Sequence, residues 1–351
     1  MIFLYNSLFV LLFGFLNINK LKSNKWKKIY LLICFFQMFL IQGLRDVSVG
    51  TDTSFYVNVY NNYHNNEYYS FLFTHYELGF QFLYNFLHYL NIDYQGMLLI
   101  VSGVTMLGFA NFIYRTSSNL ILSVFIFSCL LYPNSFNIMR QFLALSLSIN
   151  AISLIFKEKY ISSSILILFS SLFHTMSLLM FIPLILSLFK NWKLSIYILL
   201  LSCVIFFFFG SYIVNFGATI FNKQFYINND FSVNRLFRTT TLITMIICII
   251  MIYCTRFNKS KVDNKFKLLT CISIVNLNFG ILYLKYEFMS RIIEMFNSFL
   301  LISFPLASYE IKTYYRPIIK IMVWAIPVVL LINSVFNSGS GIENYKFFFS
   351  N

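Results

Sequence analysis

The sequence alternates long apolar runs with short breaks that carry most of its charge. The apolar runs lie near residues 2–18, 29–44, 97–114, 119–132, 138–156, 160–173, 175–189, 194–214, 239–255, 267–284, 289–307 and 317–336. With 59% of its residues hydrophobic and only 11% charged, the chain has more apolar surface than a soluble fold can cover. The sequence therefore predicts an all-α integral membrane protein with about 12 transmembrane helices. We expect these helices to form one polytopic domain over residues 1–351.

The net charge of +14 would favour nucleic-acid binding in a soluble protein. Here the basic residues form short clusters between apolar runs, as in the cytoplasmic loops of membrane proteins. The predicted partner of the chain is therefore the lipid bilayer, and no nucleic acid is expected.

The lysines orient the predicted helices. If the lysine-rich loop 19–28 is cytoplasmic, alternate loops place 15 of the 18 lysines inside but only three of the eight arginines. The same topology puts all four histidines and nine of the twelve acidic residues outside, together with two long extracytoplasmic loops, 45–96 and 215–238. The ionisable chemistry of the chain is thus predicted on the face away from the cytosol.

Five arginines lie on this predicted outer face. Arg45, Arg140 and Arg291 each occupy the first or last turn of an apolar run, and Arg235 and Arg238 lie in or beside the second long loop. A guanidinium binds phosphate through two parallel hydrogen bonds and keeps its charge at every physiological pH. The arginines therefore indicate a polyanion-binding site. The alternative for each of them is an interaction with lipid headgroups.

Three residues on this face are candidates for a general base. Asp52 and Glu77 are carboxylates in the first long loop, and His174 interrupts an apolar stretch where an ionisable group is a functional candidate. Structural roles are open for all three: Asp52 could cap a helix that begins near Thr53, Glu77 could pair with an arginine, and His174 could bond to a backbone carbonyl.

The first long loop also contains nine tyrosines and a helical pattern. Its stretch "ELGFQFLYNFLHYL" places Phe80, Leu83, Leu87 and Leu90 on one face, which is typical of a helix lying at a membrane interface. No Walker, GxGxxG, HExxH, GxSxG or EF-hand motif occurs in the chain, so no cofactor is predicted.

Five short motifs follow one another in a characteristic order. They are "GLRDVSVGTDTSFY", "YELGFQFL", "NIMRQFLALSLSINAISLIFKEKY", "LFHTMSLLMFIPL" and "SRIIEMFNSFLLISFP". In this order and rough spacing, residues 40–306 resemble the EpsG/Wzy-like family of bacterial polysaccharide polymerases. Leu78 follows Glu77 where many relatives have proline, which is a small departure from the family pattern.

The resemblance implies a GT-C-like helical bundle in the bacterial inner membrane with an extracytoplasmic active site. It implies a metal-independent glycosyltransferase that moves a growing glycan from undecaprenyl pyrophosphate to a hydroxyl of the next lipid-linked repeat unit. A chain-length regulator and a flippase are the protein partners implied. The arginines would then hold the pyrophosphate, and Asp52, Glu77 or His174 would be the base. Tyr56 and Gln141 would be among the residues that hold sugars.

Two other functions fit a polyanionic, lipid-linked substrate. A flippase for lipid-linked oligosaccharides would have cationic residues along a cavity open to both faces, whereas here the ionisable residues gather on one face. An O-antigen ligase would share the chemistry but use a different acceptor. A multispan O-acyltransferase is a more distant alternative.

Overall fold

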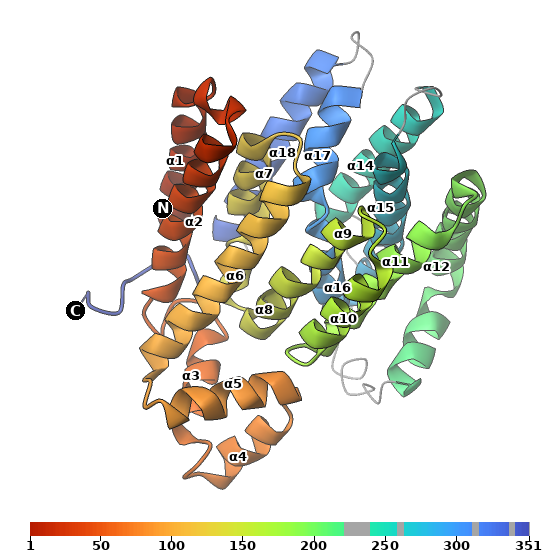
Figure 1. Cartoon of the computed structure of the whole chain (residues 1–351). Coiled ribbons are helices and arrows are strands. Elements are labelled where there is room, and N and C mark those ends of the chain that lie inside the picture. Colours follow the sequence, from red (N-terminus) through yellow and green to blue (C-terminus); the bar gives the residue numbers. More distant parts are fainter. Residues whose placement is uncertain (221–238, 258–262, 311–315, 337–340, 351) are drawn as a thin grey trace. The chain divides into compact units, whose positions relative to one another are not determined.

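The computed structural model describes residues 1–220, 239–257, 263–310, 316–336 and 341–350. Every regular element in these ranges is a helix, and the only β feature among them is an isolated bridge between Arg45 and Phe347 (Figure 1). The chain forms two compact units: Met1–Leu184 with Pro327–Asn351, and Ile185–Ile326.

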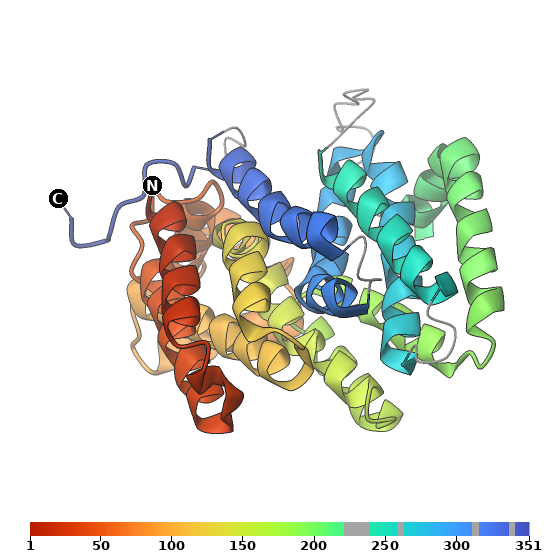
Figure 2. The same cartoon turned by 90° about the horizontal axis from the view of Figure 1, so that it is seen from above.

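The first unit contains most of the helices. Its elements are α1 (Ile2–Leu16), η1 (Lys20–Lys22), α2 (Asn24–Gly43), α3 (Thr53–Asn62), α4 (Glu67–Thr74), α5 (Leu78–Tyr89), α6 (Tyr94–Thr116), α7 (Leu120–Ile126), η2 (Phe127–Leu131), η3 (Asn134–Phe136), α8 (Met139–Ser148), α9 (Asn150–Ile155), α10 (Tyr160–Ser171) and η4 (Thr175–Met180). Helix α2 packs along α6, and α1 lies beside both α2 and α7 (Figure 2).

The second unit contains the longest helix. Its elements are α12 (Trp192–Ile220), α14 (Thr239–Phe257), α15 (Asn264–Tyr283), η5 (Glu287–Met289), α16 (Ser290–Asn297) and α17 (Leu300–Glu310). Two helices cross the boundary between the units, α11 (Phe181–Leu188) and α18 (Arg316–Phe336). Within the second unit, α15 packs against both α12 and α14 (Figures 1 and 2).

Each predicted apolar run is helical in the structure, so the all-α prediction is confirmed. Three described helices are long and apolar enough to cross a membrane: α6, residues Trp192–Gly217 of α12, and α15. A fourth span arises if Glu287–Asn297 and Leu300–Ser308, which meet at 54°, are counted together. The other apolar helices are shorter, and the total of about 12 spans stays a prediction.

Side chains at the helix starts explain several element boundaries. The Ser23 hydroxyl accepts a hydrogen bond from the Trp26 N–H at the start of α2, and Asp93 accepts from the Gly96 N–H at the start of α6. Asn66 accepts from two backbone N–H groups at the start of α4. Such caps satisfy N–H groups that have no partner within the helix, and each contributes about 1 kcal/mol.

A close contact between α6 and α8 fixes the position of α8. A Cβ atom on Gly108 would lie 2.5 Å from the Ser146 carbonyl oxygen, so only glycine permits this approach. The Asn150 amide then donates to the Gly108 carbonyl oxygen at 2.9 Å, and Asn111 donates to the Asn150 side-chain oxygen at 2.7 Å. Packing therefore holds α8 along α6, and hydrogen bonds hold the start of α9 there.

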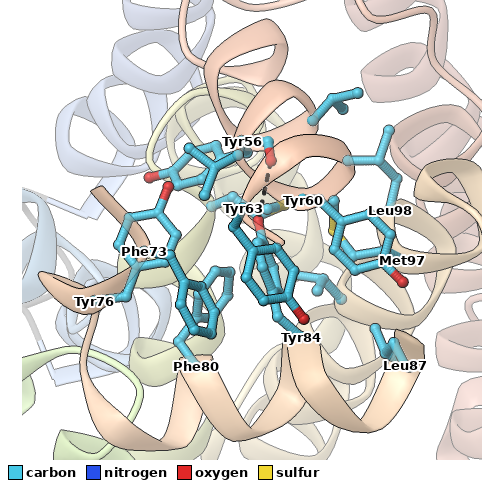
Figure 3. Close-up of a cluster of buried hydrophobic side chains, with 14 of the residues drawn as sticks. Tyr56, Tyr60, Tyr63, Phe73, Tyr76, Phe80, Tyr84, Leu87, Met97 and Leu98 are labelled. Carbon is cyan, nitrogen blue, oxygen red and sulfur yellow. Dashed lines mark hydrogen bonds between the residues drawn. The ribbon is translucent and has the colours of Figure 1, made fainter. Parts of the chain in front are cut away.

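The first long loop, 45–96, contains three helices, α3 to α5. Their facing sides form a cluster of buried aromatic and aliphatic residues (Figure 3). Phe80 and Leu87 are fully buried in this cluster, and Leu83 packs against it. The face that we predicted to lie at the membrane interface is therefore directed into the protein. Periodicity alone does not distinguish these two environments, because protein core and lipid both select apolar residues.

Arg45 is buried at the end of α2, with only 1% of its surface exposed. Its Nη1 atom donates to the Gln42 carbonyl oxygen at 2.7 Å and its Nε atom to the Thr53 hydroxyl at 3.3 Å. Burial lowers the pKa of Arg45 to about 10, so the side chain keeps its charge at neutral pH. Arg45 thus holds α2 to the start of α3, and its role as a ligand for phosphate stays a prediction.

The segment 341–350 packs over the loop that follows Arg45. Gly50 donates its N–H to the Gly341 carbonyl oxygen at 2.9 Å, and Asp46 donates to the Lys346 carbonyl oxygen at 3.0 Å. Gly50 has a φ of +90°, where other residues are strained. These bonds fix the conformation of residues 44–52.

Replacement of Arg45 by methionine should destabilise the protein by about 2–4 kcal/mol, because the Gln42 carbonyl and the Thr53 hydroxyl lose a buried donor. Thermal unfolding in detergent measures this change. Asp46→Asn is the matched control, since an asparagine oxygen still accepts from the Ser48 N–H as Asp46 does at 2.9 Å. An unchanged melting temperature for Arg45→Met would contradict the structural role.

Candidate functional site

An ion pair joins two residues that are 63 positions apart in the sequence. Arg140 is the second residue of α8, and its Nη1 atom lies 2.7 Å from Oε2 of Glu77, the residue that precedes α5. The two side chains are 21% and 17% exposed. The pair is therefore shielded from most of the solvent but not fully buried.

The second oxygen of Glu77 faces the start of η4. Its Oε1 atom accepts from the Thr175 backbone N–H at 3.2 Å and lies 3.8 Å from Nδ1 of His174. That Nδ1 atom accepts the Met176 N–H at 3.2 Å, which caps η4. Because this bond uses the Nδ1 lone pair, a neutral His174 has its proton on Nε2. His174 is thus arranged as an N–H donor, and the 3.8 Å approach is a contact rather than a charged hydrogen bond.

Three aromatic rings surround the guanidinium. The Arg140 Cζ atom is 4.2 Å from the centre of the Tyr76 ring, 5.9 Å from that of Phe80 and 6.0 Å from that of Tyr56. The close-up shows these three rings grouped at one end of the buried cluster (Figure 3). Burial raises the pKa of the Tyr76 hydroxyl, so this residue stays neutral, and the charge of Arg140 opposes the shift. Aromatic faces stabilise a cation and exclude water from it.

Asp52 directly precedes α3, the helix that carries Tyr56. It occupies the N-cap position of α3, but its side chain makes no capping bond and accepts only from the Thr51 hydroxyl, at 3.1 Å, among the described residues. Tyr56 follows one helical turn later, about 6 Å along the axis. The Thr51 N–H donates to the Asn137 side-chain oxygen at 2.9 Å, which ties this loop to the segment before Arg140. The carboxylate of Asp52 is half-buried and is not used as a helix cap.

The structure therefore brings together four of the predicted site residues: Tyr56, Glu77, Arg140 and His174. Gln141 is adjacent to Arg140 in the chain and is buried, with 2% of its surface exposed.

Of the other predicted arginines, one lies in the second unit and two lie outside the described residues. Arg291 is exposed near the start of α16 in the second unit. Arg235 and Arg238 lie outside the described residues, as does most of the predicted loop 215–238.

Three contributors to the site were missed from the sequence: Tyr76, Phe80 and the backbone of Thr175. Each is close in sequence to a residue that was predicted. Tyr76 precedes Glu77, Phe80 is three residues beyond it, and Thr175 follows His174. Closeness in sequence to an ionisable residue could therefore have pointed to these three residues. Aromatic residues are so frequent in this chain that such closeness does not single out a site residue.

Gly79 holds α5 against α10 beside the ion pair. Its N–H donates to the Leu172 carbonyl oxygen at 2.7 Å, and a Cβ atom at this position would lie 2.8 Å from the same oxygen. Any side chain here must push apart the two segments that carry Glu77 and His174.

Gly79→Ala should therefore destabilise the first unit by about 1–3 kcal/mol and weaken the contact between Glu77 and the start of η4. Gly103→Ala is the matched control, because a Cβ atom there meets Phe39 at 3.5 Å, an ordinary contact. Thermal unfolding of both variants tests the expectation. Equal melting temperatures for the two would contradict it.

The arrangement combines a shielded cation, an imidazole N–H and a carboxylate that does not cap its helix. The guanidinium and the N–H suit an anionic group, and the carboxylate suits proton transfer. The sequence profile of the EpsG family matches residues 28–348, which is nearly the whole chain. The chain belongs to the EpsG family. EpsG proteins are a Wzy-like, glycosyltransferase-like family of polysaccharide polymerases, and all the site residues named above lie within the match. No curated protein and no solved structure matches the chain.

Proposed function

We propose that this EpsG-family protein polymerises oligosaccharide repeat units that are carried on undecaprenyl pyrophosphate. The growing glycan moves from its lipid carrier to a hydroxyl of the incoming lipid-linked unit. The reaction takes place on the extracytoplasmic face of the bacterial inner membrane, within a GT-C-like bundle.

One observation carries this proposal: Arg140, Glu77 and His174 come from three distant segments and meet at one partly open site. An ion pair of purely structural origin does not require an imidazole ring in contact with it. Nor does it require a carboxylate that makes no capping bond one helical turn before Tyr56. Family membership supports polysaccharide polymerisation as the general activity.

The proposed transfer replaces one bond to the anomeric carbon by another and moves one proton. The bond between the anomeric carbon of the donor glycan and its pyrophosphate oxygen breaks, and the acceptor hydroxyl oxygen bonds to that carbon. The hydroxyl proton passes to a base, and undecaprenyl pyrophosphate leaves with the bonding electrons. Pyrophosphate is a good leaving group when its charge is stabilised, so cationic side chains in a shielded site can supply much of the catalysis.

In this scheme Arg140 binds the pyrophosphate and Glu77 holds the guanidinium in position until the substrate arrives. The Nε2–H of His174 donates a second hydrogen bond to the phosphate oxygens. Asp52 takes the acceptor proton, because its carboxylate is less engaged than that of Glu77. We propose that Tyr56 and Gln141 contribute to sugar binding.

Arg291, Arg235 and Arg238 are proposed as further contacts to the phosphates. The scheme involves no resident cofactor. A flippase that delivers the units and a regulator of chain length are its proposed protein partners.

The fate of the repeat units in cells that lack the protein tests this function against the two alternatives. Without a polymerase, single units should be displayed outside the inner membrane. Without a flippase, lipid-linked units should be trapped inside, and without a ligase, polymer should stay on undecaprenyl pyrophosphate. Gel separation of the glycans from cells with an intact and with a permeabilised inner membrane distinguishes the three outcomes. Either of the last two would overturn the proposal.

A further inference from the structure

Helix α5 has an apolar face directed away from the protein. Leu78 is 73% exposed, Phe82 70%, Phe86 48% and Tyr89 83%. Their spacing of four, four and three residues places them on one side of the helix. The rings of Phe82 and Phe86 stack with centres 6.1 Å apart, so part of this face forms a continuous aromatic surface.

The opposite side of α5 is buried. Phe80 and Tyr84 are 0% exposed and Leu87 is 2% exposed within the cluster of Figure 3. Between Tyr68 and Ile92 the only charged residue is Glu77. A helix that faces water on one side normally carries charges there, and one that is apolar all round is covered by protein or lipid.

We infer that the outward face of α5 is immersed in the interface of the lipid bilayer, opposite to the face predicted from the sequence. Tyrosine is enriched at the boundary between headgroups and acyl chains, and phenylalanine and leucine are typical of the immersed face of a helix that lies there. Figure 1 shows α5 lying across the direction of α6 rather than along it, as a helix parallel to a membrane surface would lie. The occupant is therefore phospholipid, not a second protein.

The exposed surface of α10 continues this face. Helix α10 is apolar and exposes Ile161, Ile165 and Leu168, and Leu172, which follows the helix, is also exposed. Their spacing of four, three and four residues is that of a lipid-facing stripe. The Leu172 carbonyl accepts the Gly79 N–H, so the α10 stripe ends where the α5 stripe begins. The exposed apolar residues of α10 and α5 are thus joined at this hydrogen bond.

This position sets the depth of the candidate site. Glu77 directly precedes Leu78, so immersion of α5 places the ion pair with Arg140 at the level of the lipid phosphates. A carrier diphosphate would meet the site there without leaving the membrane. This consequence for the substrate depends on the proposed function, whereas the lipid contact of α5 does not.

Photocrosslinking tests the lipid contact directly. Benzophenone-alanine replaces Phe82 in the otherwise native chain, which is placed in nanodiscs of synthetic phosphatidylglycerol and phosphatidylcholine and irradiated. The intact mass of the protein should increase by the mass of one phospholipid. The same probe at Ile165 is the positive control, and at Asn65, an exposed residue off the stripe, it should give no lipid adduct.

Each outcome has one meaning. Lipid adducts at 82 and 165 but not at 65 support the inference. A protein dimer crosslinked through position 82 overturns it in favour of a second copy, and label at 165 without label at 82 overturns it in favour of a water-exposed face. Because the readout is a mass and not polymer, failure of the proposed function would leave the result unchanged.

Discussion

Arg140→Ala is expected to abolish long polymer chains while the protein still inserts in the membrane. Among the described residues of the first unit, Arg140 is the only arginine that pairs with Glu77, which in turn contacts His174, and this variant removes its guanidinium. Loss of one preorganised charge at a leaving group typically lowers a rate by about 100-fold or more. The rate of chain elongation, measured from the length distribution of the glycan, checks this expectation.

Stability must be separated from chemistry in this variant. Removal of Arg140 leaves Glu77 without its cation, which should cost about 1–3 kcal/mol for a partly exposed pair. Arg140→Lys keeps the charge but loses the planar fork, so it should fold better than Arg140→Ala and elongate more slowly than the native chain. Arg115→Ala is the matched control, because Arg115 is exposed at the end of α6 and bonds only to Asn111 among the described residues. Normal chain length in Arg140→Ala would remove Arg140 from the site.

Asp52→Asn is expected to lower the elongation rate by about 100-fold to 10,000-fold, as loss of a general base does. The reason is structural: the carboxylate sits at a helix N-cap position without capping, and accepts one hydrogen bond from Thr51. Asparagine preserves the size and that hydrogen bond but cannot take a proton. Initial rates with purified protein and lipid-linked units measure the effect.

Two further variants sharpen this test. Asp46→Asn alters a neighbouring carboxylate whose Oδ1 accepts from the Ser48 hydroxyl at 2.6 Å, and it should elongate normally. His174→Asn can still accept the Met176 N–H but lacks the ring Nε2–H, so it should lose less activity than Asp52→Asn. If His174→Asn is the inactive variant and Asp52→Asn elongates at the native rate, the base is not Asp52.

The helices were predictable because apolar runs of this length have no stable alternative in a membrane, where backbone groups must bond within the segment. The runs near 97–114 and 267–284 correspond to α6 and α15 within a few residues. The sequence did not reveal the break in the run 138–156, where α8 ends at Ser148 and α9 begins at Asn150. In the first long loop the sequence indicated helices at the positions of α3 and α5 but did not reveal α4.

The site was predictable in its residue types but not in its pairings. Glu77, Arg140 and His174 stood out as ionisable groups near apolar runs, yet only folding shows that they meet, because the contacts join segments 63 and 97 positions apart in the chain. Arg45 stood out for the same reason and proved to be buried, with its donors bound to the Gln42 carbonyl and the Thr53 hydroxyl. The sequence shows that an arginine is present, but not whether its N–H groups already donate hydrogen bonds to acceptors within the protein.

Helix α5 illustrates a similar limit. Its pattern correctly indicated a helix with an apolar face, but both sides of the helix are apolar. Which side faces the protein depends on how α5 packs with α3 and α6. The spacing of apolar residues in the sequence does not contain this information.

Reconstitution of the purified protein in liposomes with its own lipid-linked repeat units tests the central claim most directly. The account predicts a ladder of lengthening glycans, with one undecaprenyl pyrophosphate released for each unit added, and neither product from Arg140→Ala. Movement of the units across the bilayer without a ladder, or an equal ladder from the native chain and Arg140→Ala, would contradict it.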